Sequence, residues 1–192
     1  MSERRLVLIG GGVRSGKSAF ALRRACELGA RRVFIATAQA FDGEMQTRIE
    51  RHVDERGDEF DTIEEPLELA EVLSELESDT EVVVVDCLTL WLSNLLLQDR
   101  SEAQIADAID RLVTVLEARR AHVVVVTNEV GMGVVPESRL GRVFRDVSGL
   151  AHQRLSAIAD EIYAGMLGCM LRLHPAPLQV ERAVPKSAGG RS

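Results

Sequence analysis

The chain has 192 residues, of which 46% are hydrophobic and 28% charged, and its formal net charge is −7. That length fits one domain around a single core, and the acidic balance argues against a nucleic-acid partner, since domains that bind nucleic acid carry a basic stripe. The three cysteines form no CxxC pair and no apolar run approaches the roughly 20 residues that span a bilayer, so we expect no zinc site, no membrane span and a cytoplasmic protein.

Four β-branched runs, each bounded by turn or polar residues, predict strands. They are Leu6–Ile9, Val33–Ala36, Val82–Val85 and Val123–Val126. None alternates strictly between polar and apolar residues. The runs therefore predict strands buried on both faces, as in a parallel sheet covered by helices.

Segments with the helical spacing of apolar residues separate and follow these runs: Lys17–Leu28, Gly43–Arg56, Leu67–Leu76, Ala103–Arg119 and a long helix that begins near Ser138. Alternating strands and helices predict an α/β fold with a mostly parallel sheet flanked by helices. A final strand is expected within Met166–Leu173. Residues 1–173 are expected to form one nucleotide-binding domain and residues 174–192, rich in Pro, Ala, Gly, Ser and Arg, a flexible tail.

A glycine-rich segment between the first strand and the first helix matches G-x-x-x-x-G-K-[ST]: Gly11, Gly12, Val13, Arg14, Ser15, Gly16, Lys17 and Ser18. In a phosphate loop of this kind, backbone N–H groups and a helix N-terminus surround the phosphates. Lys17 would reach the β- and γ-phosphates, and the Ser18 hydroxyl would bind Mg²⁺. The alternative is a chance glycine-rich turn, and the strand and helix on either side argue against it.

Asp86 follows the third predicted strand, at the end where open α/β sheets bind ligands. It is a candidate partner of Ser18 for Mg²⁺, as in other phosphate-loop enzymes. The alternative role is a helix N-cap, because the apolar segment Leu88–Leu97 comes directly after it.

The predicted helix Gly43–Arg56 carries three basic residues on one face, namely Arg48, His52 and Arg56, and Asp42 is placed as its N-cap. Such a face could meet a triphosphate, and a neutral imidazole nitrogen can attack phosphorus. The residues alone favour the alternative, a solvated helix face with an exposed histidine.

The segment Thr127–Glu137 follows the fourth predicted strand and holds polar residues and two glycines, with Arg139, Arg142 and Arg145 spaced by three on the next helix. We expect an active-site loop, because such loops carry function on a rigid scaffold. A plain connection followed by a solvated basic face is the alternative.

Five segments together resemble a known family. They are GGxRSGKS at Gly11–Ser18, IATAQ at Ile35–Gln39, D-x-E-M-x-x-R-I-x-x-H at Asp42–His52, VVDCLTLWLSN at Val84–Asn94 and TNEVGMGVVPE at Thr127–Glu137. In this order and spacing they resemble the bifunctional adenosylcobinamide kinase / adenosylcobinamide-phosphate guanylyltransferase family, from about Leu6 to Ile162. After Tyr163 the chain departs from the family's pattern, with Gly165 and Gly168 in the region of the last strand.

The resemblance implies a single-domain, RecA-like P-loop NTPase fold and two reactions. A nucleoside triphosphate, ATP or GTP, phosphorylates adenosylcobinamide, and GTP then donates GMP to adenosylcobinamide phosphate. By the motif match His52 is the histidine that carries GMP, and Mg²⁺ is the cofactor. Nucleotide contacts are implied for the phosphate loop and for five further residues: Thr37, Ala38, Gln39, Glu64 and Asp86. Relatives form homotrimers, so a homo-oligomer is expected.

Two other functions stay open at this point. A P-loop kinase of another small metabolite would leave His52 with a structural role only. A nucleotide-dependent switch protein would signal to a protein partner, although 192 residues leave little room for a coupling domain.

Overall fold

A computed structural model describes residues 4–39 and 59–182 of the chain. The strands run in chain order as follows: β1 Leu6–Gly11, β2 Arg32–Ala36, β3 Asp61–Glu64, β4 Val82–Asp86, β5 His122–Val126, β6 Glu161–Met166, β7 Cys169–His174 and β8 Gln179–Arg182. The helices are α1 Lys17–Leu28, α3 Leu69–Glu75, α4 Leu88–Leu97, α5 Glu102–Glu117 and α6 Arg139–Ile158.

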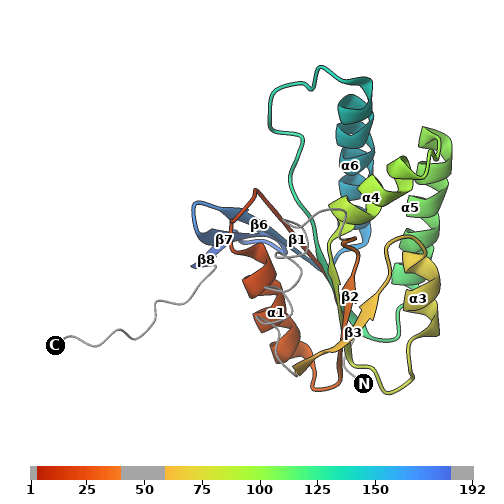
Figure 1. The fold of residues 1–192 in the computed structure, drawn as a ribbon. Helices are drawn as coiled ribbons and strands as arrows, with labels where there is room; N and C mark the ends of the chain where they lie inside the picture. The colour runs from red at the N-terminus through yellow and green to blue at the C-terminus, as the bar shows by residue number, and fades with distance from the viewer. Residues whose placement is uncertain (1–3, 40–58, 183–192) are drawn as a thin grey trace.

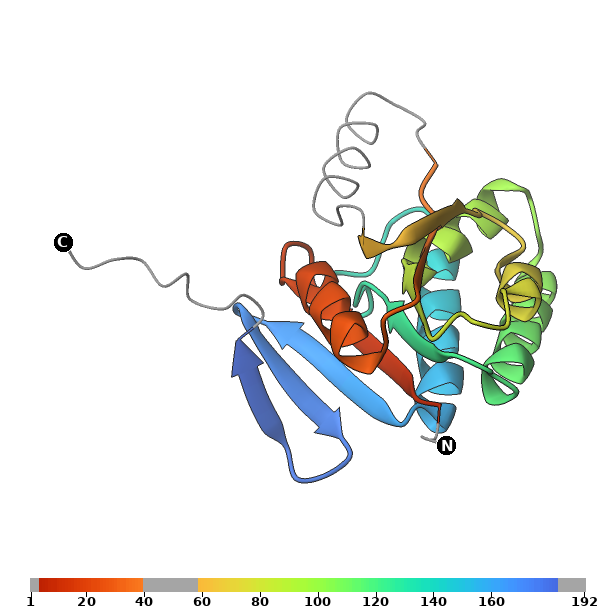
Figure 2. The same cartoon turned by 90° about the horizontal axis from the view of Figure 1, so that it is seen from below.

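Within the described ranges the strands form one eight-stranded sheet in the order β3-β2-β4-β5-β1-β6-β7-β8. Pairing is parallel from β3 to β6, and β7 and β8 are added antiparallel. The predicted α/β fold with a mostly parallel sheet is therefore confirmed. Figure 2 shows β6, β7 and β8 continuing the sheet beyond α1.

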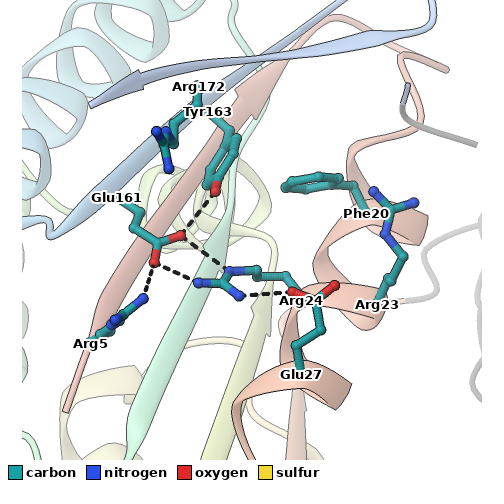
Figure 3. Close-up of a pocket in the computed structure, with 8 residues that line it drawn as sticks. All are labelled: Arg5, Phe20, Arg23, Arg24, Glu27, Glu161, Tyr163 and Arg172. Atoms are coloured by element: carbon teal, nitrogen blue, oxygen red, sulfur yellow. Dashed lines mark hydrogen bonds and ion pairs between the residues drawn. The ribbon is translucent and has the colours of Figure 1, made fainter. Parts of the chain in front are cut away.

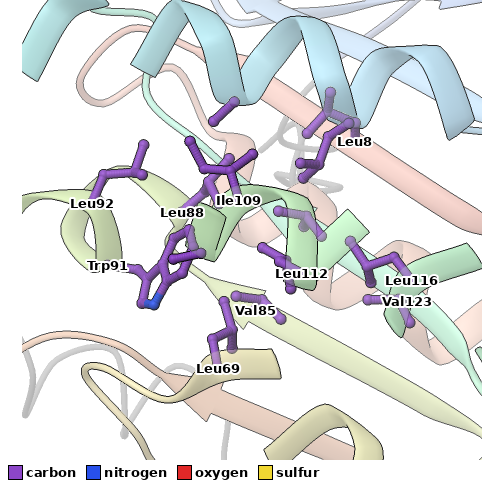
Figure 4. Packing of buried hydrophobic residues seen from close by; sticks show 14 of the residues in the cluster. Leu8, Leu69, Val85, Leu88, Trp91, Leu92, Ile109, Leu112, Leu116 and Val123 are labelled. Atoms are coloured by element: carbon purple, nitrogen blue, oxygen red, sulfur yellow. The ribbon is translucent and has the colours of Figure 1, made fainter. Parts of the chain in front are cut away.

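Helix α1 lies on one face of the sheet, and α3 to α6 lie on the other (Figures 1 and 2). Alternate residues of each central strand supply the two cores, as the two-residue period of a strand requires. Val83 and Val85 face the larger helical layer, for example, while Val82 and Val84 face α1. Figure 4 shows part of the larger core, in which Trp91 and Leu112 are almost fully buried.

The central strands are buried along most of their length, as predicted from the missing alternation. The predicted helix Lys17–Leu28 is confirmed at both ends, and Ser138 is the N-cap of α6, where its side chain accepts a hydrogen bond from Gly141 N. The predicted helix Gly43–Arg56 lies outside the described residues.

The single strand expected in Met166–Leu173 is wrong in detail, because two strands, β6 and β7, meet there in a hairpin. Gly168 forms the turn with a φ of 74°, a left-handed conformation that suits glycine. Gly165 lies inside β6, where a Cβ atom would come within 2.8 Å of both Met170 Cε and Ser15 Oγ. Both glycines thus have a role in the strand pairing that the sequence pattern obscured.

Two short strands at the sheet edges were not predicted. β3 (Asp61–Glu64) has three exposed residues of its four and so lacks an apolar pattern. β8 lies within the predicted flexible tail and pairs with β7, which corrects that expectation for Gln179–Arg182. The domain limits remain a prediction. In the part of the chain that the structure describes, no helix is both long and apolar enough to cross a bilayer.

Candidate functional site

The carboxyl ends of the central strands meet at one edge of the sheet. Asp86 at the end of β4 pairs in register with Ala36 of β2 and with Val126 of β5, and Val126 pairs with Ile9 of β1. The segments that follow these residues therefore leave the sheet side by side. This is the position at which open α/β sheets bind ligands.

The phosphate loop curls from the end of β1 into α1. Gly16 is the N-cap of α1 with a φ of 87°, which a residue with a side chain adopts only at a steric cost. Lys17 Nζ donates a hydrogen bond to Gly12 O at 3.1 Å, so the ammonium group lies over the loop. Val13 and Arg14 form the exposed outer side of the loop.

Ser15 is a buried polar residue of the loop. Its Oγ has no hydrogen-bond partner among the described residues, although the backbones of Gly11 and Gly165 pack closely around it. A Cβ atom at Gly11 would approach both Ser15 Oγ and Gly165 O to 2.8 Å, so only glycine fits between the loop and β6. A buried hydroxyl without a partner in such a loop suits a ligand oxygen, because buried polar groups are normally paired.

Lys17 and Asp86 are the charged pair of the site. Burial lowers the pKa of Lys17, and the nearby Asp86 carboxylate acts in the opposite sense. The carboxylate is therefore close enough to the loop to influence its lysine. The N-cap of α4 is Cys87 and not Asp86, so the alternative capping role predicted for Asp86 is wrong.

Cys87 lies beside these charged residues, but its thiol is unreactive. Its side chain is buried, and burial raises its pKa to about 11, with the neighbouring Asp86 adding to the effect. Its sulfur lies 3.2 Å from Thr89 Oγ1. A thiol with so high a pKa stays protonated near neutral pH and is a poor nucleophile.

Ser18 and Asp86 carry the oxygen atoms that the sequence predicts as ligands of Mg²⁺. Ser18 is the second residue of α1 and half-buried, next to Lys17, which feels the Asp86 charge. Mg²⁺ prefers oxygen ligands and usually takes only one or two carboxylates from the protein, together with waters and substrate phosphates. No group of three His, Cys, Asp or Glu residues that could enclose a metal occurs among the described residues.

Thr37 joins the ends of β2 and β4. Its hydroxyl donates to Cys87 O and accepts from Cys87 N, both at 2.8 Å, and its carbonyl accepts from Asn94 Nδ2. The side chain is fully buried, so its hydroxyl is already used inside the protein. Ala38 and Gln39 follow it half-buried at the sheet edge. Glu64 ends β3 beside Ala36 and is exposed.

The segment after β5 is tied to the phosphate loop. Thr127 N donates to Ile9 O at 2.9 Å, and Glu129 N donates to Gly11 O at 3.0 Å. Asn128 N donates to Thr89 Oγ1. These bonds place the predicted active-site loop at the site, between the phosphate loop and α4.

Sequence reasoning singled out this loop but missed the histidine that contacts it. His152 of α6 lies 2.8 Å from Thr127 Oγ1 through Nε2 and 3.6 Å from Glu129 Oε2 through Nδ1. Burial lowers the pKa of His152, and Glu129 partly offsets that effect. No sequence signal links His152 to residues some 25 positions earlier, because only the packing of α6 against the sheet brings them together.

The arginines predicted as a basic face take several places. Arg142 Nη1 donates to the carbonyl oxygens of Pro136 and Glu137 and so closes the loop onto the start of α6. Arg145 contacts its neighbour Asp146, and Arg139 is exposed at the first turn. Arg142 thus has a structural role.

A separate cavity of about 210 Å³ lies beside α1 and away from the carboxyl edge, lined by Arg5, Phe20, Arg23, Arg24, Glu27, Glu161, Tyr163 and Arg172 (Figure 3). At its centre the buried Glu161 accepts hydrogen bonds from Arg5, Arg24 and Tyr163. These contacts join α1, β6 and Arg5, the residue before β1. We therefore interpret the cluster as a structural one.

His52, Arg48, Arg56 and Asp42 lie outside the described residues. The remaining predicted site residues, namely Gly11 to Ser18, Thr37 to Gln39 and Asp86, gather at the carboxyl edge, and Glu64 lies at the outer end of the same edge.

The sequence model of the family described as "Cobinamide kinase / cobinamide phosphate guanyltransferase" matches residues 7–173. The bifunctional adenosylcobalamin biosynthesis protein CobP of Pseudomonas aeruginosa is 40% identical over 171 residues, which cover 89% of this chain and 98% of that protein. The protein CobU of Escherichia coli, with the same description, is 36% identical over 180 residues, covering 88% of this chain and 99% of its own.

Solved structures support the fold alone. The RadB recombinase superposes with a TM-score of 0.53 at 18% identity, over 93% of this chain and 86% of that one. A solved ATPase domain gives a TM-score of 0.51 at 13% identity, over 92% of this chain and 80% of that one. These likenesses confirm the predicted RecA-like arrangement.

Proposed function

The chain belongs to the cobinamide kinase / cobinamide phosphate guanyltransferase family, and from that premise we propose how its residues divide the two reactions. The protein is a bifunctional cobinamide kinase and cobinamide phosphate guanylyltransferase of adenosylcobalamin biosynthesis. The supporting observation is the gathering of the phosphate loop, Lys17 and Asp86 at one edge of the sheet. Family membership decides against a kinase of another metabolite and against a switch protein.

In the kinase reaction the phosphate loop holds the triphosphate of ATP or GTP. Backbone N–H groups of the loop and the N-terminus of α1 face the phosphate oxygens. Lys17 moves from Gly12 O to the β- and γ-phosphates and neutralises charge on the group in transfer, which is where most catalysis of phosphoryl transfer lies.

Mg²⁺ is the cofactor in this proposal, and it supplies charge neutralisation at the phosphates when it is bound. Ser18 Oγ and the Asp86 carboxylate would hold it. Thr37 supports Asp86 indirectly, because its hydrogen bonds fix the backbone of Cys87, the next residue.

In the second reaction His52 accepts GMP from GTP and passes it to cobinamide phosphate. The support is the motif match from Asp42 to His52 and the chain position, shortly after the end of β2 at the carboxyl edge. A neutral imidazole is a competent nucleophile, and a covalent carrier splits one displacement into two. Ala38, Gln39 and Glu64 are proposed to contact the nucleotide from the same side.

The protein is proposed to act as a homo-oligomer, a trimer by the family resemblance, in the cytoplasm. All three cysteines, Cys26, Cys87 and Cys169, are free thiols, which suits a reducing compartment.

The proposal is tested by incubating the purified protein with adenosylcobinamide, GTP and Mg²⁺ and following the products by mass. We expect the phosphate to form first and the GDP derivative to follow. In the variant Lys17→Ala both rates should fall on the order of 100-fold or more, because both reactions use the same cation. Arg31→Ala, which removes an exposed cation from the opposite end of β2, is the control with unchanged rates. Absence of both products from wild-type protein would refute the assignment.

A further inference from the structure

The proposed function assigns no residue to remove the proton from the acceptor hydroxyl in the kinase step. In the sheet, β5 lies directly beside β1, between β1 and the strand that ends in Asp86. The chain leaving β5 therefore passes the phosphate loop on its way to α6. Glu129 N donates to Gly11 O, which fixes this segment against the first residue of the loop.

The Glu129 side chain has polar neighbours on two sides. Its Oε1 accepts a hydrogen bond from Gly131 N at 2.7 Å, and its Oε2 lies 3.6 Å from His152 Nδ1. His152 is in turn held by Thr127 through Nε2. The Glu129 side chain is 38% exposed, whereas that of His152 is 19% exposed. His152 therefore lies on the more buried side of the carboxylate, which remains open to a substrate.

The other carboxylates at this edge are poorer candidates for the base of the kinase step. Asp86 interacts with Lys17 and is assigned to Mg²⁺. Glu64 ends β3, on the far side of β2, β4 and β5 from the phosphate loop. Among the described residues Glu129 is thus the exposed carboxylate fixed directly to the phosphate loop.

We propose that Glu129 is the catalytic base of the kinase step and that His152 is a positioning residue that orients it; this rests on the proposed function. The O–H bond of the cobinamide hydroxyl breaks and its proton passes to the Glu129 carboxylate. The hydroxyl oxygen bonds to the γ-phosphorus. The bond from the γ-phosphorus to the bridging oxygen breaks, and its electron pair stays on the nucleoside diphosphate.

The second reaction gives this proposal a sharp control. The group that attacks in guanylyl transfer is a phosphate monoester, whose second pKa is near ~6. At about pH 8 it carries no proton that must be removed, so guanylyl transfer needs no base at this position. A base role at Glu129 therefore affects one reaction only, whereas a structural role would affect both.

The test compares Glu129→Gln with wild type in two assays: phosphorylation of adenosylcobinamide, and guanylyl transfer to preformed adenosylcobinamide phosphate. Gln keeps an oxygen acceptor for Gly131 N, so the loop should remain folded. We expect kcat of the kinase reaction to fall on the order of 100-fold or more, with KM values and guanylyl transfer within about threefold of wild type. Glu117→Gln, an exposed carboxylate at the end of α5, is the matched control.

The two assays separate the possible outcomes. Unchanged kinase kcat, or an equal loss in both reactions, would overturn the base assignment. If wild-type protein shows neither activity, the proposed function itself is refuted. Failure of the base assignment can therefore be told apart from failure of the proposed function.

The role of His152 is tested by a double-mutant cycle. His152→Ala should lower kinase kcat on the order of tenfold without a change in KM, and His152→Gln, which keeps a polar side chain beside Glu129, should restore part of it. In the Glu129→Gln background His152→Ala should have no further effect, since residues that act as a unit are not additive. Additive losses would show that His152 does not act through Glu129.

Discussion

At the scale of single residues, the site depends on side chains that hold backbone as much as on side chains that meet substrate. The family resemblance predicts a nucleotide contact for Thr37, yet its hydroxyl bonds to both the N–H and the carbonyl of Cys87. A motif shows that a residue type is required but not which partner requires it. Asp86, by contrast, is not the N-cap of α4, because that position is taken by Cys87.

Replacing Asp86 with Asn removes the charge and keeps the volume. We expect the Mg²⁺ concentration for half-maximal kinase rate to rise on the order of tenfold or more, because a carboxylate is the preferred protein ligand of Mg²⁺. The melting temperature should change little. Asp79→Asn, at an exposed ion pair with Arg31, is the control that should titrate as wild type. If Asp86→Asn also titrates as wild type, Asp86 is not a metal ligand.

At the scale of elements, Glu161 fixes β6 against α1 and β1. Burial alone would raise the pKa of Glu161, but hydrogen bonds from Arg24, Tyr163 and Arg5 outweigh it and hold the pKa below its usual range. A carboxylate with a lowered pKa stabilises the fold above its unfolded-state pKa, and this contribution is lost as the pH falls through the lowered value. The contribution is therefore complete at neutral pH.

Glu161→Gln should lower the free energy of unfolding by about 3 kcal/mol at pH 7, because it removes the buried counter-charge of the half-buried Arg24 and leaves only the exposed Glu27. The difference from wild type should be constant at neutral pH and should shrink only below about pH 4, near the unfolded pKa of Glu. Urea unfolding across this range measures both. Glu27→Gln removes the exposed partner of the same arginine and should cost less than about 1 kcal/mol. A difference that does not depend on pH would contradict this account.

The elements that could be predicted from sequence are those whose residues bury apolar side chains. β4 (Val82–Asp86) and β5 (His122–Val126) are read directly from their valines, and α1 from its motif and spacing. β3 and β8 could not be predicted, because edge strands depend on backbone pairing and need few apolar residues. β6 was not predicted, because a glycine at position 165 argues against a strand in the sequence pattern. The close approach of Ser15 requires a glycine there.

At the scale of the whole molecule, one edge of the sheet collects the described residues that we propose for the two reactions. The phosphate loop and Asp86 could be predicted from their motifs because each follows a strand in the expected order. The contact of His152 with Thr127 and Glu129 could not be predicted, because it depends on how α6 packs against the sheet. The central proposal is that His52 carries GMP in guanylyl transfer, whereas phosphorylation needs no covalent carrier.

That claim is tested most directly by the covalent step. Wild-type protein incubated with GTP labelled at the α-phosphate should acquire label that is lost in acid and kept in base, as a phosphoramidate requires. His52→Ala should acquire none and lose guanylyl transfer, yet keep phosphorylation of adenosylcobinamide, because direct γ-phosphoryl transfer needs no covalent carrier. His174→Ala, at the exposed end of β7, should label as wild type. Label that persists in His52→Ala, or unchanged guanylyl transfer by that variant, would contradict the account.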